Sequence, residues 1–340
     1  MKKSLLALAV LGAFAGAASA QSSVTIYGLL DLAVTKGNGG TSPNAGGNGL
    51  STAYIMKQSA ASRLGFRGSE DIGGGWSAQF QIEHRFTPDN GLPNAIFWEG
   101  RSYVQITNAA IGSLYMGRDY TPAFWPAVKV DPFGWDGVGQ INGNQWALFR
   151  TNPGGNVRTP NTVGFKTRSF GGVTVQAAVG LGEGSAISGR DTGFNVEYAG
   201  GPIYAGLGYE KITNGPAAFA GDELINFGFS YDLGFIKPMF HIGSAKTGPL
   251  PTKIKSRDIM FGLTAPIGPG KLKFAVDRLD GNTSLGNTTL VNSERTKFGI
   301  GYDYPLSKRT NVYADLGQGK SQFAGATTNR AAAVGMKHTF

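Results

Sequence analysis

Short segments in which apolar and polar residues alternate recur along the whole chain. In 76–86 the apolar and aromatic residues occupy every second position, joined by one histidine, and the positions between them hold Ser77, Gln79, Gln81, Glu83 and Arg85. Because successive side chains of a strand point to opposite faces, this period of two predicts half-buried β-strands. We predict sixteen of them, centred near residues 29, 63, 81, 103, 115, 164, 176, 196, 206, 227, 240, 261, 275, 300, 313 and 335.

The connections between these segments alternate in length. Short links occupy 68–75, 108–112, 169–172, 199–202, 232–234, 266–270 and 305–309. Longer polar stretches, rich in Gly and Asn, occupy 36–53, 87–96, 119–160, 181–193, 211–222, 244–257, 279–295 and 317–330. Short turns at one end and long loops at the other predict an antiparallel up-and-down transmembrane β-barrel of the outer-membrane type. A barrel of about sixteen strands encloses an aqueous channel rather than a packed core.

The composition agrees with this all-β prediction and excludes other classes. Glycine makes up 53 of the 340 residues without a collagen-like period, and glycine weakens helices. Aromatic residues, at 11%, are too frequent for a disordered chain. A mean hydropathy of −0.12 suits a wall in which lipid-facing positions alternate with water-facing ones. With no cysteine, the chain has neither a disulfide framework nor thiolate chemistry.

The first twenty residues have the pattern of a secretory signal peptide. Lys2 and Lys3 precede an apolar run, and small residues follow up to the sequence Ala18-Ser19-Ala20. The run is too short to cross a bilayer as a helix. We therefore expect residues 1–20 to be cleaved on export and residues 21–340 to form one barrel domain.

Four motifs of the mature chain resemble those of a known family. They are QSSVTIYG at 21–28, SRLGFRGSEDIGGG at 62–75, MGRDY at 116–120 and the C-terminal HTF. These motifs resemble the general diffusion porins of Gram-negative outer membranes, especially the trimeric, anion-preferring type of β-proteobacteria. The resemblance covers essentially all of 21–340. It implies a sixteen-stranded barrel, a homotrimer, a third long loop folded inward, and recognition of Phe340 by the barrel-insertion machinery.

Candidate pore residues come from the alternation and from the resemblance. Alternation directs Arg63, Glu83, Arg85 and Arg101 to the lumen, and Arg158 directly precedes a predicted strand. The resemblance places Arg63 and Arg158 on basic constriction positions, and Glu83 and Asp131 on acidic ones. Another basic position of that type falls on Gly100 here, beside Arg101, which weakens the expected anion selectivity. The remaining candidates in or beside the third long loop are Arg118, Asp119 and Asp136.

The resulting functional prediction is a porin of the outer membrane. We expect a water-filled channel for passive diffusion of ions and small hydrophilic solutes, weakly anion-preferring, with no cofactor. The formal charge is +9, or +7 without Lys2 and Lys3 of the expected leader. The basic residues of the mature chain are scattered over many strands, which fits a lumen bias or contact with outer-membrane lipid and lipopolysaccharide, and does not fit a nucleic-acid footprint. The three histidines lack metal-ligand spacing and no serine stands out as a nucleophile, so we expect no enzyme.

Two alternatives remain open from the sequence. A substrate-specific channel for sugars or organic acids would use aromatic residues of the third long loop, namely Phe124, Trp125, Phe133, Trp135 and Trp146. A structural or adhesive barrel would have a plugged lumen instead of a wet one.

Overall fold

The computed structural model describes residues 23–37, 53–141, 157–184, 189–213, 220–247, 254–285, 288–289, 295–321 and 328–340. The expected leader, 1–20, lies outside the described residues. The described part is almost entirely β-structure, with a short helix α2 (Phe124–Val128) and a 3₁₀ turn η1 (Gly182–Gly184). No helix in it is long and apolar enough to cross a membrane.

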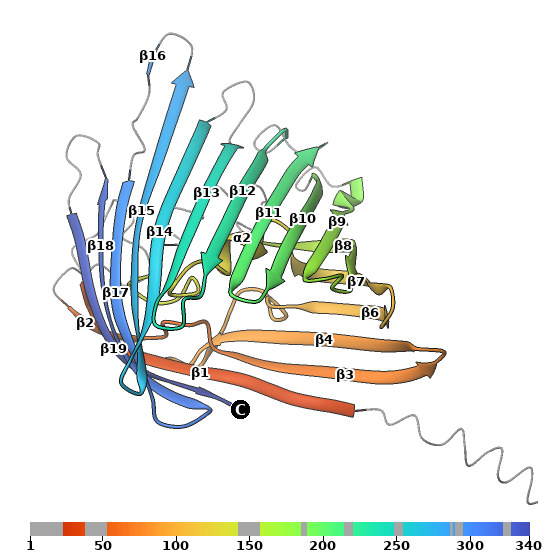
Figure 1. The fold of residues 1–340 in the computed structure, drawn as a ribbon, viewed down its shortest axis with the longest axis horizontal. Coiled ribbons are helices and arrows are strands. Elements are labelled where there is room, and N and C mark those ends of the chain that lie inside the picture. The colour runs from red at the N-terminus through yellow and green to blue at the C-terminus, as the bar shows by residue number, and fades with distance from the viewer. Residues whose placement is uncertain are drawn as a thin grey trace, which may run out of the picture.

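Nineteen strands, all joined in antiparallel pairs, form one sheet in the described residues (Figure 1). Three are short pieces: β2 (Tyr54–Lys57), β5 (Leu92–Pro93) and β16 (Thr288–Thr289). The other sixteen form the wall: β1 (Ser23–Gly37), β3 (Arg63–Gly73), β4 (Trp76–Thr87), β6 (Ser102–Asn108), β7 (Gly112–Tyr120), β8 (Arg158–Thr167), β9 (Val173–Gly180), β10 (Arg190–Gly200), β11 (Ile203–Thr213), β12 (Glu223–Tyr231), β13 (Lys237–Thr247), β14 (Ile254–Ile267), β15 (Gly270–Leu285), β17 (Arg295–Pro305), β18 (Thr310–Ser321) and β19 (Thr328–Thr339).

The wall closes on itself because β1 pairs with β3 on one side and with β19 on the other. Backbone hydrogen bonds between Gly28 and Phe340 extend this closure to the last residue. The sixteen-stranded antiparallel barrel predicted from the alternation is therefore confirmed, and each predicted strand centre falls within one of the sixteen wall strands.

Several predicted connections are longer than the observed ones, because the wall strands extend into them. The first short link was expected at 68–75, but β3 continues to Gly73 and the chain turns only at Gly74 and Gly75, both with positive φ. The third long connection narrows from 119–160 to 121–157, because β7 runs to Tyr120 and β8 begins at Arg158. Polar residues at the ends of a barrel wall remain in water, so they do not stop a strand as they would in a buried sheet.

The distribution of apolar and polar side chains over the two faces of the wall is the reverse of that in a soluble β-protein. Large apolar side chains such as Val104 and Val334, 55% and 65% exposed, point outward. Polar side chains such as Asn195, Asp258 and Lys273 are buried on the inner face. This arrangement suits a wall with lipid outside and a polar lumen inside.

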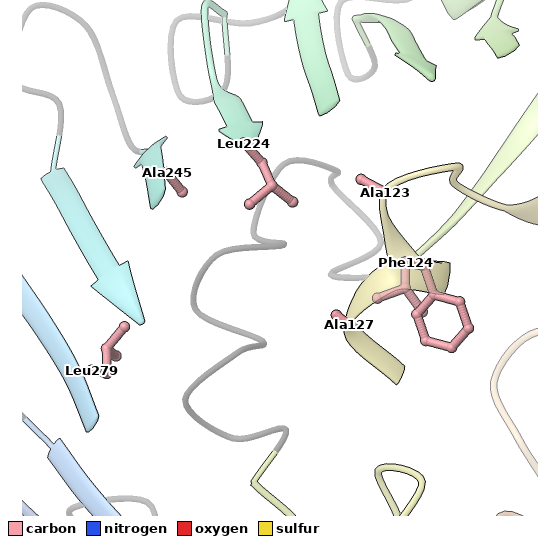
Figure 2. Packing of buried hydrophobic residues seen from close by; sticks show 7 residues of the cluster. Ala123, Phe124, Ala127, Leu224, Ala245 and Leu279 are labelled. Atoms are coloured by element: carbon pink, nitrogen blue, oxygen red, sulfur yellow. The ribbon is translucent and has the colours of Figure 1, made fainter. Parts of the chain in front are cut away.

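The described part of the third long connection packs against the inner face of the wall. Ala123, Phe124 and Ala127 from this segment belong to one buried apolar cluster with Leu224 of β12 and Leu279 of β15 (Figure 2). Helix α2 contacts β10, β11 and β12. The apolar core of the molecule therefore lies between this segment and the wall.

Polar and glycine residues of the wall fix the backbone of the same segment. Asn195 Nδ2 donates to the Pro122 carbonyl at 2.8 Å, and Asn226 Nδ2 donates to the Ala123 carbonyl at 2.9 Å. A Cβ added to Gly228 would lie 2.1 Å from the Pro126 carbonyl oxygen. Only glycine at this strand position lets the segment approach so closely.

Candidate functional site

Two large cavities inside the barrel lie on either side of the 131–136 segment. One, of about 510 Å³, is lined by Arg63, Arg158 and other residues near the strand ends that carry the long connections; we call it the loop-side cavity. The other, of about 460 Å³, is lined by Lys237 and Lys271, which follow short turns; we call it the turn-side cavity. Gly134 and Asp136 line both cavities, so this segment separates them.

Arg85 in the loop-side cavity is neutralised by Glu83. Its Nη2 lies 2.7 Å from Glu83 Oε1, and both side chains are almost fully buried. Arg85 also donates to the Ala61 carbonyl at 3.1 Å, while Glu83 accepts a hydrogen bond from Tyr27 Oη at 3.1 Å. These neighbouring β4 positions therefore add little net charge to the cavity.

Arg101 is neutralised by a residue that sequence spacing does not place beside it. Its Nε lies 3.0 Å from Asp119 Oδ1, and its Nη1 donates to Gln81 Oε1 at 3.3 Å. Asp119 itself lines a smaller cavity behind Tyr120, not the loop-side cavity. The Asp119 carboxylate therefore affects the charge of the loop-side cavity only by neutralising Arg101.

Arg158 is held by an aromatic ring rather than by a carboxylate. Its Nη2 donates to Tyr120 Oη at 2.7 Å, and its guanidinium carbon lies 4.3 Å from the centre of the same ring. Tyr120 in turn stacks on Phe124 with 4.3 Å between ring centres. The interaction with the ring orients the guanidinium and leaves its charge in place.

Arg63 pairs across β3 and β4 with Arg85, a second cation. Among the described residues, neither Arg63 nor Arg158 has a carboxylate within ion-pair distance, whereas Arg85 and Arg101 do. The uncompensated positive charge of the loop-side cavity therefore comes from Arg63 and Arg158.

Gly100 leaves room for the Glu83 side chain. A Cβ at this position would lie 2.4 Å from Glu83 Oε1 and 2.7 Å from Glu83 Cβ. The absence of a basic side chain at Gly100 is therefore linked to the position of Glu83, which packs over the glycine.

Asp131 shapes the connecting segment and faces the turn-side cavity. Its two carboxylate oxygens accept hydrogen bonds from the backbone N–H groups of Phe133 and Trp135, both at 2.9 Å. Burial raises the pKa of the Asp131 carboxyl to about 6, against the opposing effect of these donors. Asp131 therefore holds the turn of the segment as well as lining a cavity.

The structure distributes the predicted site residues as follows. Six border the loop-side cavity: Arg63, Glu83, Arg85, Arg101, Asp136 and Arg158. Asp131 lines only the turn-side cavity, and Asp119 lies behind the wall of the loop-side one. Arg118 turns away, donating its Nε to the Glu99 carbonyl at 3.0 Å.

The sequence reasoning missed several lysines of the lumen. Lys129 pairs with Glu197 at 2.7 Å, and Lys273 pairs with Asp303 and Asp315 at 2.8 and 3.1 Å. Lys297 donates to the Gln140 carbonyl at 2.6 Å. The alternation of the sequence does indicate two of these lysines, because Lys273 and Lys297 occupy inward-facing positions of their strands.

The loop aromatics pack mainly against each other and against cations. Phe124 contacts Trp125 and Trp135 edge-on at 5.2 and 5.1 Å between ring centres, and Lys273 Nζ lies 4.7 Å from the centre of Phe133. Trp146 lies outside the described residues. In the part of the chain that the structure describes, no group of three His, Asp or Glu side chains is placed to hold a metal ion.

Comparison with known proteins places the barrel and its charged lumen in a family. Residues 7–324 match the model of the Gram-negative porin family. Over the full length of both chains, the protein is 32% identical to outer membrane porin protein 32 of Delftia acidovorans and 28% identical to an outer membrane porin protein of Bordetella pertussis. A solved anion-selective porin from Comamonas acidovorans, 27% identical, superposes with a TM-score of 0.80 over 94% of this chain and 100% of the other. The chain therefore belongs to the Gram-negative porin family and is a porin of the outer membrane.

Proposed function

We propose that the protein is a passive, weakly anion-preferring channel whose selectivity arises at the loop-side cavity. The observation that carries this proposal is the imbalance among its arginines: Arg85 and Arg101 have carboxylate partners, and Arg63 and Arg158 have none among the described residues. The porin from Comamonas acidovorans is described as anion-selective, which is the same sign of selectivity as the one proposed for this protein. No cofactor or energy source is required, and we expect no catalytic activity.

The mechanism is electrostatic filtering in water. A fixed positive charge raises the local concentration of anions and lowers that of cations, and low-dielectric walls focus the field. Asp136 on the connecting segment faces the same cavity as Arg63 and Arg158. Burial raises the pKa of the Asp136 carboxyl to about 7, so at neutral pH it carries only part of a negative charge. This partial charge faces the positive charges of the arginines across the path, which weakens the net anion preference and orients dipolar solutes. A weak bias therefore fits these residues better than strict exclusion of cations.

The alternatives from the sequence have less support. A substrate-specific channel for sugars or organic acids would present a row of exposed aromatic faces, whereas Phe124 and its neighbours contact each other and the wall. A plugged structural barrel would fill the space that the two cavities occupy. The family relationship also favours general diffusion of small hydrophilic solutes.

We further propose the assembly and the export route. A homotrimer is supported by a structural neighbour from Vibrio cholerae, 14% identical, which was solved in a trimer form. Cleavage after residue 20 would leave a mature chain from 21. Phe340, 44% exposed on the outer wall, is available to the barrel-insertion machinery before the barrel closes. Lipopolysaccharide is the expected anionic neighbour in the outer leaflet.

The test is the reversal potential of single channels in a salt gradient across a planar bilayer. The double variant Arg63→Gln/Arg158→Gln should move the reversal potential toward cation preference. A matched control, Lys308→Gln/Arg309→Gln, removes the same charge from an exposed short turn and should leave the potential unchanged. Equal potentials for wild type and the Arg63/Arg158 variant would refute the role of these two arginines.

A further inference from the structure

Among the described wall strands, the outward face of the barrel carries its own set of cations at one end and not at the other. Nine lysines and arginines near the long connections alternate with buried positions and therefore point outward. They belong to the strands β1, β10, β11, β13, β14, β15, β18 and β19. We call this set the outer collar: Lys36, Arg190, Lys211, Lys246, Lys255, Arg257, Arg278, Lys320 and Arg330. On the same face and end, these strands and β12 carry only two acids, Glu223 and Asp280.

The opposite end of the outer wall has a different composition. Outward positions near the short turns of the described strands hold Tyr198, Tyr231, Tyr302 and Tyr304, and neither lysine nor arginine. The exposed cations at this end, Arg168, Lys308 and Arg309, lie in the short turns beyond the strands and not on the wall itself. The asymmetry therefore indicates a negatively charged neighbour on the side of the long connections.

The collar lies at the height of lipid headgroups. On β14 the outward positions from Ile259 to Ile267 carry no charge, and Arg257 is the first cation beyond them. Ten residues from Arg257 to Ile267 span roughly 33 Å along the strand, or about 25 Å along the barrel axis at the usual tilt. This height matches the apolar band of an outer-membrane barrel, so Arg257 lies at the edge of the hydrocarbon region.

Like charges meet within the collar. Lys246 of β13 lies directly opposite Lys255 of β14, and Lys211 lies opposite Glu223, which pairs with Lys246. This row thus places three cations around one acid. Like charges directly opposite each other destabilise a sheet, so a bound anion between them would relieve a cost the barrel otherwise carries.

The other side of the barrel lacks this feature. The outward faces of β3, β4, β6, β8 and β9 carry no lysine or arginine in the described residues, and Arg118 near the end of β7 is bound to the Glu99 carbonyl. This cation-free side instead exposes Phe97, 57% exposed and stacked on His84 at 4.1 Å between ring centres. The two sides of the wall thus meet different neighbours, and only the collar side is built for an anionic lipid.

We propose that the outer collar binds the phosphate groups of lipopolysaccharide directly, with the row around Lys246, Lys255 and Arg257 as its strongest part. This inference deepens the lipopolysaccharide contact proposed above and rests on it. Lysine and arginine donate charge-assisted hydrogen bonds to phosphate oxygens. Because these side chains supply the positive charge themselves, binding persists when divalent cations are chelated.

The experiment measures binding of purified protein to phosphorylated lipopolysaccharide micelles in EDTA. Three samples are compared: wild type, the collar variant Lys246→Gln/Lys255→Gln/Arg257→Gln, and a control variant Arg168→Gln/Lys308→Gln/Arg309→Gln, which loses equal charge from exposed short turns. The collar variant should bind on the order of a hundredfold more weakly. The control should change by less than about twofold because its substitutions lie away from the outer leaflet.

Two further probes identify the ligand group. Dephosphorylated lipopolysaccharide and phosphatidylglycerol vesicles should both bind wild type much more weakly than phosphorylated lipopolysaccharide does. Equal binding of wild type and collar variant, or equal binding of lipopolysaccharide and phosphatidylglycerol, would overturn the proposal. Channel conductance and reversal potential of the same variants are recorded in parallel. An unchanged channel with lost lipopolysaccharide binding supports the collar, whereas a non-conducting wild type would refute the channel proposal without affecting the binding result.

Discussion

Removing the acid of the Glu83–Arg85 pair should strengthen anion preference, and the size of the effect follows from simple electrostatics. The substitution Glu83→Gln keeps the shape of the side chain and an oxygen that accepts the hydrogen bond from Tyr27 Oη. It leaves Arg85 charged, still donating to the Ala61 carbonyl at 3.1 Å. The loop-side cavity therefore gains one net positive charge.

The magnitude depends on salt. For an ion about 8 Å from the altered charge, the Coulomb energy is about 0.5 kcal/mol in water without screening, and about 0.2 kcal/mol at 0.15 M salt. The added charge stabilises an anion by this energy and destabilises a cation by the same amount. The free-energy difference between anion and cation in the cavity therefore changes by twice this value. We expect the anion-to-cation permeability ratio to rise about fivefold at low salt and about twofold at 0.15 M.

The assay is the reversal potential of single channels, recorded in salt gradients at a low and at a physiological mean concentration. The control is Glu70→Gln, the same chemical change at an exposed outward-facing position of β3. The control should leave the potential unchanged at both concentrations. A Glu83→Gln channel that becomes more cation-preferring, or that shifts equally at both concentrations, would refute an electrostatic role for this pair.

The remaining predictions concern the salt dependence and the connecting segment. In 1 M salt, where the Debye length is about 3 Å, the reversal potential of wild type should approach the value set by ion mobilities alone; a preference that persists there would indicate a chemical binding site. The double variant Asn195→Ala/Asn226→Ala removes both side-chain hydrogen bonds to the Pro122 and Ala123 carbonyls, each contributing about 1 kcal/mol. It should increase open-channel noise and mean conductance, and current traces as quiet as those of wild type would contradict this role.

The sequence was sufficient to predict the barrel because the period of two needs only local information. Each strand shows its own alternation, so an error in placing one segment does not prevent the recognition of the other strands. The positions of Arg63, Glu83 and Arg85 facing the lumen follow from the same rule. Strand ends were predicted less accurately, because polar residues at the ends of a barrel wall can continue a strand as well as end it.

The pairing of charges could not be predicted in this way. Whether Arg101, directly before β6, is neutralised depends on Asp119 of β7, which lies beside it only because of the register between β6 and β7. The place of the connecting segment depends likewise on Gly228 and Asn226, about one hundred residues away in the chain. Alternation shows which face a side chain takes and carries no information about what it meets there.

The same alternation separates two functions within single strands. On β14, Asp258 is buried toward the lumen, and its neighbour Arg257 points outward into the collar. A register shift of one residue would exchange them, placing a cation in the lumen and an acid against the lipid headgroups. Closure of the barrel opposes such a shift, because β14 is paired with both β13 and β15 along its length. Ion selectivity and membrane contact can therefore change independently by substitution, because the wall holds the two sets of charges on opposite faces.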